Sequence, residues 1–144
     1  MTGCYVVAYD GSPAGRRAVD FAVALARATG AGIVVAHVLD WSPYSFLTKE
    51  EIAERHKRRS EELARARTAI LDPLTEALRA TGTEVETEIR YGKVVETLLD
   101  IARERGAAQI VAGRTGEAGL TNRLFGSVAG TLAQVSPVPV TIVP

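Results

Sequence analysis

The chain has 144 residues, of which 47% are hydrophobic and 24% charged, the balance of one folded domain with enough chain to bury a substantial core. Its 17 basic and 17 acidic side chains cancel, so the net charge gives no reason to expect nucleic acid or an anionic membrane as a partner. No apolar run is long enough to span a bilayer, the first ten residues lack the pattern of a signal peptide, and the single cysteine, Cys4, excludes an internal disulfide. We therefore expect one cytoplasmic domain over residues 1–144.

Apolar runs alternate with helical patterns along the chain, as in a parallel α/β sheet. The first strand is predicted at residues 5–9, after which Ser12 and Pro13 supply a helix cap and a proline at the first helical position. Residues 33–38 are an apolar run that contains His37, typical of a strand that is buried on both faces. The positions of the first helix that we expect to face the sheet are Ala14, Ala18, Phe21 and Leu25.

A second, highly charged helix is predicted to begin near Lys49, with Pro73 expected to kink or restart it. Its basic run at residues 55–59 is interpreted as a solvated helix face, because glutamates precede several of its arginines by four residues. The apolar stripe of this helix is predicted to comprise Leu63, Ala66, Ile70, Leu74 and Leu78. Two interpretations stay open for the aromatic residues that precede it, a flap over a ligand or packing at the sheet edge: Trp41, Tyr44 and Phe46.

The second half of the chain continues the alternation, giving four helices between five strands in total. Residues 84–89 alternate strictly, with glutamates on one side and Val85, Thr87 and Ile89 on the other, as in a half-exposed edge strand. The next helix carries its apolar positions at Val95, Leu98, Leu99 and Ala102. The fourth strand is predicted at 109–112, the last helix at 127–134 and the last strand at 138–143, where two prolines favour a sheet edge.

The character of the strands predicts their order. The third and fifth have the pattern of edge strands, and the first, second and fourth that of central strands. The fold class that satisfies this sorting is α/β, a single-domain doubly wound five-stranded parallel sheet in the order 3-2-1-4-5, with helices on both faces. Its switch point lies between the first and fourth strands, where a crevice opens at their carboxyl ends. The segments expected there are Tyr9-Asp10-Gly11 and the loop that begins at Gly113.

That loop, GRTGEAGLTNRLFGS at residues 113–127, contains glycines at the spacing G-x2-G-x9-G-S. The two glycines at its start let the backbone approach a bulky anion and leave N–H groups free to point at it. The Gly-Ser pair at its end precedes a helix, whose first N–H groups have no partner within the helix. A phosphate site is therefore predicted, against the alternative that the glycines serve only in turns and caps. Two arginines of the loop, Arg114 and Arg123, are placed to add positive charge.

With these residues the chain resembles the universal stress protein family, of the kind that binds adenine nucleotides. The resemblance covers essentially the whole length, from VVAYDGSPAGRRAVDFA through IVVAHVLD and the glycine motif to SPVPVTIVP. It implies an ATP-binding regulator of the stress response that acts through nucleotide-dependent conformation or partner binding. It also implies a homodimer formed through the last strand, Val138 to Val143.

The resemblance assigns roles to residues of this sequence. It puts Val38 beside the adenine, the glycine loop and Val128 against ribose and phosphates, and Asp10 near the ribose and a phosphate-bound Mg²⁺. The nucleotide-binding residues that we predict are Ala8, Asp10, Val38, Gly113, Arg114, Gly116, Gly126, Ser127 and Val128. Arg114 and Thr115 stand where many members of the family have a small hydroxyl residue and a histidine, so AMP, cyclic AMP and ADP stay open alongside ATP.

The role of Asp10 and the class of activity stay open. Asp10 is either a turn-forming residue before Gly11 or the metal-assisted acid near the nucleotide, and only the second role predicts dependence on Mg²⁺. His37 is expected to be a core histidine with its hydrogen bonds satisfied. The sequence offers no clear general base or triad, so an enzyme would be at most a slow, Mg²⁺-dependent ATP hydrolase. A dimeric interaction module that binds no ligand is a third possibility.

Overall fold

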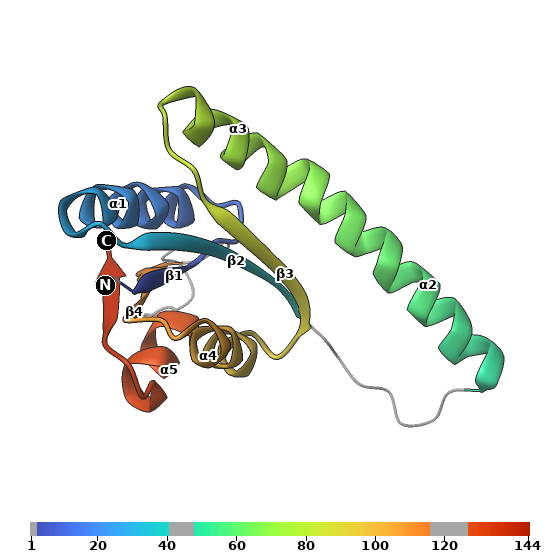
Figure 1. Ribbon diagram of the computed structural model, residues 1–144. Helices are drawn as coiled ribbons and strands as arrows, with labels where there is room; N and C mark the ends of the chain where they lie inside the picture. The colour runs from blue at the N-terminus through green and yellow to red at the C-terminus, as the bar shows by residue number, and fades with distance from the viewer. Residues whose placement is uncertain (1–2, 41–47, 116–126) are drawn as a thin grey trace.

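The computed structural model describes residues 3–40, 48–115 and 127–144. Figure 1 shows strands and helices alternating along the chain. The strands are β1 (Cys4–Ala8), β2 (Gly32–Asp40), β3 (Glu86–Gly92), β4 (Gln109–Gly113) and β5 (Val140–Val143). The helices are α1 (Pro13–Thr29), α2 (Lys49–Ala66), α3 (Asp72–Ala80), α4 (Val94–Arg105) and α5 (Ser127–Val135), with a π-helical turn, η1 (Arg67–Leu71), between α2 and α3.

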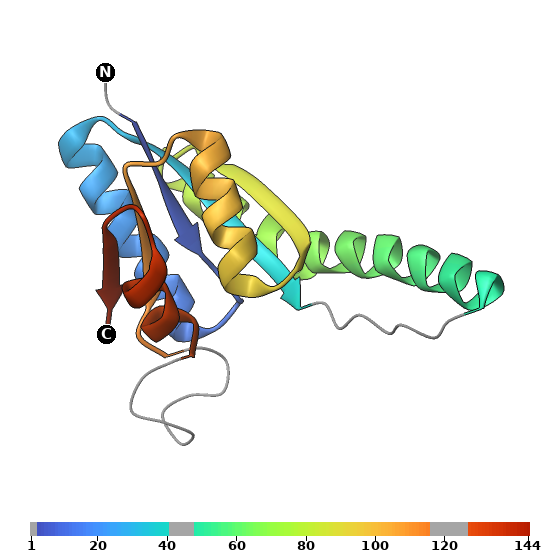
Figure 2. The ribbon, with the colours of Figure 1, turned by 90° about the horizontal axis from the view of Figure 1, so that it is seen from below.

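The five strands form one parallel sheet in the order β3-β2-β1-β4-β5, which confirms the predicted topology. The edges are β3 and β5, as their sequence patterns predict. On one face the sheet is covered by α1 and α3, and on the other by α4 and α5 (Figures 1 and 2). The helices leave β1 and β4 on opposite faces, so the switch point lies between the carboxyl ends of these two strands.

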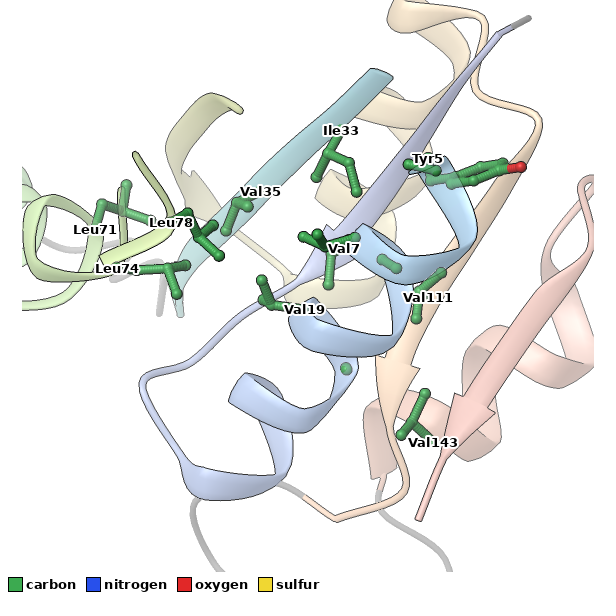
Figure 3. Packing of buried hydrophobic residues seen from close by; sticks show 14 residues of the cluster. Tyr5, Val7, Val19, Ile33, Val35, Leu71, Leu74, Leu78, Val111 and Val143 are labelled. Atoms are coloured by element: carbon green, nitrogen blue, oxygen red, sulfur yellow. The ribbon is translucent and has the colours of Figure 1, made fainter. Parts of the chain in front are cut away.

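Each face of the sheet has its own apolar core, because successive side chains of a strand point to opposite faces. Val7, Val35 and Val111 pack toward α1 and α3, as Figure 3 shows, together with Leu71, Leu74 and Leu78. Their sequence neighbours Val6, Val34 and Ile110 pack toward α4 and α5. Burial on both faces explains why the central strands are continuous apolar runs in the sequence.

The start of α1 follows the sequence prediction, but one residue of its buried face does not. Ser12 is the N-cap, its Oγ accepts from Gly15 N–H at 3.0 Å, and Pro13 opens the helix. Phe21 is 43% exposed, so its predicted place against the sheet is wrong. The buried arc of the helix is centred near Ala22, and Phe21 lies outside it. The small side chains of this arc let the helix lie close to the strands. That arc comprises Ala14, Gly15, Ala18, Val19, Ala22, Val23 and Ala26.

The predicted charged helix is divided by the π-helical turn, so the described residues form five α-helices where four helices were expected. Pro73, in the first turn of α3, lacks an N–H and crowds the carbonyl four residues earlier, and the wider π turn ahead of it accommodates both. The same turn shifts the apolar stripe by one residue at this point. Leu71 is fully buried, whereas Ile70, which was predicted to belong to the stripe, is only partly buried.

Most of α2 lies outside the packed core. Ala66 is the single buried residue of this helix, and Figure 1 shows its N-terminal part extending away from the sheet. The Arg58 and Glu54 side chains pair at 3.3 Å on its exposed surface, in keeping with a solvated face. Across residues 3–40, 48–115 and 127–144, no helix has the length and apolarity needed to cross a membrane.

Ion pairs hold the edge strand β3 to α4. Arg90 donates to both carboxylate oxygens of Glu104, at 2.9 and 3.1 Å, and to Glu88 at 3.3 Å. Arg105 donates to Glu88 at 2.9 and 3.2 Å and also pairs with Glu86. Burial works to raise the pKa of Glu88, but the hydrogen bonds from Arg105 and Arg90 outweigh it, so this pKa lies below its ordinary value. We call this group the β3–α4 ion-pair cluster.

The end of β4 lies directly against the first turn of α1. A Cβ atom added to Gly113 would lie 3.0 Å from Ala14 O and 3.2 Å from Thr115 O. Both neighbours are backbone atoms, which cannot swing aside as a side chain can. Gly113 therefore allows strand and helix to meet backbone to backbone.

We predict that Gly113→Ala lowers the free energy of unfolding by about 1–3 kcal/mol, because the added methyl forces β4 and α1 apart. Chemical denaturation monitored by circular dichroism measures the difference. Gly3→Ala is the matched control, since a Cβ there meets its nearest atom, Ala108 Cβ, at an ordinary 3.6 Å. Equal stability of Gly113→Ala and wild type would show that the contact is not tight.

Candidate functional site

Asp10 organises the turn between β1 and α1. Its Oδ1 accepts from the backbone N–H of Ser12 at 3.0 Å and also from the Ser12 hydroxyl. Gly11 between them has φ 85°, a left-handed conformation that favours glycine. The turn-forming role of Asp10 is therefore present. Both bonds end on Oδ1, and Oδ2 has no hydrogen-bond partner in the described part of the chain.

Gly15 is a component of this turn that sequence reasoning missed. A Cβ on Gly15 would lie 2.9 Å from Asp10 Oδ1 and 3.1 Å from the Tyr9 ring. The signal was a glycine in the first turn of a helix, where it costs stability unless close packing requires it. Gly15 and Gly113 thus bring the ends of β1 and β4 to the same turn of α1.

The Tyr9 ring borders this turn and lies in an environment that favours its neutral form. Burial raises the pKa of its phenol, the positive charge of Arg16 works against that rise, and the charges of Asp10 and Asp20 add to it.

Three predicted site residues pack at the border of the same apolar cluster. Ala8 is the last residue of β1, Val38 lies near the end of β2, and Val128 lies in the first turn of α5. All three are partly buried and pack on the core that faces α4 and α5. Ala8 and Val38, near the carboxyl ends of the neighbouring strands β1 and β2, are apolar side chains of the kind on which a flat aromatic base packs.

The phosphate part of the predicted site is described only at its two ends. Arg114 donates its backbone N–H to Val143 O at 2.7 Å, and its side chain is exposed and able to reach an anion. Ser127 is the first residue of α5, as predicted. Gly116, Gly126, Arg123 and the aromatic residues Trp41, Tyr44 and Phe46 lie outside the described residues.

His37 is buried in the sheet, as expected of a core histidine, but only one of its ring nitrogens is bonded to a described residue. Its Nδ1 lies 2.7 Å from the carbonyl oxygen of Tyr9. Its Nε2 is buried and has no partner within the described segments. The expectation that its hydrogen bonds are satisfied is therefore met at Nδ1, while Nε2 lacks a partner in the described part of the chain.

The described residues contain no group of three or more His, Cys, Asp or Glu side chains that could hold a metal ion by themselves. A divalent cation at Asp10 would therefore need oxygen ligands from elsewhere, such as phosphate groups and water. Magnesium commonly binds in this way, through one or two carboxylates together with substrate phosphates. Asp10 Oδ2, the carboxylate oxygen without a partner in the described part of the chain, suits that kind of site.

Comparison with known proteins gives a consistent result. The model of the Universal stress protein family matches residues 5–144. Universal stress protein YxiE of Bacillus subtilis is 32% identical over 96% of each chain. The solved structure of universal stress protein UspA from Lactobacillus plantarum superposes with a TM-score of 0.84 at 24% identity, over 100% of this chain and 99% of that one.

A second solved structure bears on the site. It is a universal stress protein in complex with cAMP, with a TM-score of 0.70 at 27% identity, covering 99% of this chain and 96% of that one. The family match extends over nearly all of the chain, including the turn at Asp10 and the loop that begins at Gly113. On these grounds the chain belongs to the universal stress protein family.

Proposed function

We propose that the protein binds an adenine nucleotide in the crevice at the carboxyl ends of β1 and β4 and acts as a cytoplasmic regulator of the stress response. The observation that carries the proposal is that three partly buried apolar residues, Ala8, Val38 and Val128, border one apolar cluster, and that a polar turn at Asp10 directly follows β1. Adenine needs apolar side chains to pack on, and a ribose phosphate needs polar groups such as those of the turn. The cAMP complex of a similar protein supports the ligand class.

In this proposal, different parts of the crevice bind different parts of the nucleotide. Adenine packs on Val38 and Ala8, while ribose and phosphates lie toward Asp10, Gly113 and the start of α5. The exposed Arg114 adds a positive charge that would attract each further phosphate of the nucleotide. ATP is the ligand that the family resemblance implies, and AMP, ADP and cyclic AMP are compared with it in the experiments below.

We expect Val38→Ala to weaken binding of AMP and ATP by roughly tenfold, because it removes two methyl groups from the surface under the adenine. Isothermal titration calorimetry measures both affinities. Val95→Ala on α4 is the matched control, since it removes the same groups from another partly buried position of that cluster. Equal losses in the two variants would place the adenine elsewhere, and a wild type that binds none of the four nucleotides would overturn the proposed function.

Magnesium has a defined place in the proposal. A carboxylate near a triphosphate repels it unless a cation bridges the two, and Asp10 Oδ2 is available for that purpose. Such a cation would neutralise the phosphates and orient them. Hydrolysis would in addition need a general base for water, and the buried His37 directs its Nδ1 to a backbone carbonyl. We therefore favour a binding role, with slow ATP hydrolysis as the alternative.

Asp10→Asn separates these roles, because asparagine can keep the turn while losing the charge. We expect Mg²⁺ to strengthen ATP binding about tenfold in wild type and to have little effect in the variant, measured by calorimetry with and without Mg²⁺. Asp20→Asn is the control, since Asp20 pairs with Arg16 on the exposed side of α1. A full Mg²⁺ effect in Asp10→Asn would remove Asp10 from the metal site, and ATP turnover that survives the change would count against Asp10-dependent hydrolysis.

We also propose that the protein is a homodimer formed through residues 138–143. Of these, β5 is an edge strand whose one neighbour in the sheet is β4, so its outer N–H and C=O groups face away from the sheet. Ile142 on β5 and Val135 at the end of α5 are large apolar residues that are 38% and 53% exposed. Strand pairing across a two-fold axis would bury both kinds of group.

Light scattering after size-exclusion chromatography tests this interface. We expect wild type to elute at twice the chain mass and Ile142→Lys to elute as a monomer, because a charge would be buried in the interface. Ile52→Lys is the matched control, as Ile52 is an equally large and exposed residue, 44% accessible, on α2. A dimeric Ile142→Lys variant would exclude this interface.

A further inference from the structure

The side chain of His37 is a buried polar group that the proposed ligand contacts do not explain. It is 6% exposed and follows Ile33 and Val35 on the face of β2 that packs toward α1 and α3. Its Nε2 has no hydrogen-bond partner among the residues that the structure describes. Burying an unpartnered ring nitrogen opposes folding, so an aliphatic residue would suit this core better. The reason for a histidine lies in the bond that Nδ1 makes.

That bond holds the carbonyl group of Tyr9. Nδ1 lies 2.7 Å from Tyr9 O, and because a carbonyl oxygen only accepts, Nδ1 carries the proton. The N–H of Tyr9 donates to Ala36 O at 2.9 Å. Tyr9 follows the last residue of β1, so β2 binds it through both polar backbone groups, once with its own backbone and once with a side chain.

The peptide group between Tyr9 and Asp10 is fixed as a result. The described residues contain no cis peptide bond, and a trans peptide directs its N–H opposite to its C=O. Because the Tyr9 carbonyl is turned toward β2, the Asp10 N–H points to the other side of β1, where β4 lies. This N–H meets no acceptor in the described ranges, so it can donate to a ligand bound on that side.

We propose that His37 is a positioning residue for the nucleotide site, which fixes the Tyr9–Asp10 peptide and thereby the N–H and carboxylate that Asp10 presents to the ligand. The inference rests on the proposed function, since it takes a nucleotide to occupy the crevice. The effect continues beyond Asp10, because its Oδ1 holds Ser12 and the Ser12 Oγ accepts from Gly15 N–H. Releasing the Tyr9 carbonyl would disturb the whole turn.

His37→Leu and His37→Asn test the proposal, since leucine removes the donor and asparagine keeps an N–H near the position of Nδ1. Calorimetry with AMP and ATP gives the affinities, and thermal unfolding of the ligand-free protein gives Tm. We expect His37→Leu to bind about tenfold more weakly with no fall in Tm, and His37→Asn to bind within about threefold of wild type. Val35→Ala, on the same face of β2, is the control that lowers Tm and leaves affinity unchanged.

A second measurement needs no ligand. We expect amide hydrogen exchange at Ser12 and Gly15 to accelerate at least tenfold in His37→Leu, relative to the amide of Ile110 in the sheet. Unchanged affinity in His37→Leu, or unchanged exchange at both amides, would overturn the proposal. If wild type binds neither nucleotide, the proposed function fails, whereas faster exchange in His37→Leu would still support positioning of the turn.

Discussion

The site depends on how closely the first turn of α1 packs on the ends of β1 and β4. Two positions without side chains make this possible, Gly15 beside Asp10 and Gly113 beside Ala14. Parallel strands end at the same edge of the sheet, so this packing gathers the carboxyl ends of the two central strands around the positive end of one helix. The Asp10 carboxylate already accepts a hydrogen bond from the N–H of Ser12, the N-cap of that helix, and this bond orders the turn before any ligand arrives.

Much of the fold was predictable because burial on both sides of a parallel sheet leaves a clear pattern. Continuous apolar runs indicated the central strands, and alternation with charge indicated β3 as an edge. Residues 84–89 were nevertheless the wrong bounds for β3 (Glu86–Gly92), since periodicity locates a strand better than its ends. Phe21 was misplaced because four apolar positions at helical spacing do not say which side of their arc is buried. The π-helical turn lies directly ahead of Pro73, where the sequence predicts a kink or a restart of the helix but not its type.

The site was less predictable than the fold, because a residue type at a given spacing does not state which group it touches. The glycine at 113 was expected to make room for an anion, and its closest neighbour is the backbone of Ala14. The role of Gly15 was not predicted, because its close approach to Asp10 arises only when the turn has folded. His37 was expected to be fully bonded, and sequence alone gives no means to tell a ring with one partner from a ring with two. Gly116 and Gly126 stay predictions.

The β3–α4 ion-pair cluster bears on how copies of this chain can assemble. It places charged side chains that already have partners on the edge strand β3, which discourages another strand from pairing there. The opposite edge, at β5, has no such protection among the described residues. A sheet that can be extended at both edges grows into an open fibre, whereas one that can be extended at a single edge closes after two copies. Charges far from the crevice thus limit the size of any assembly built through strand edges.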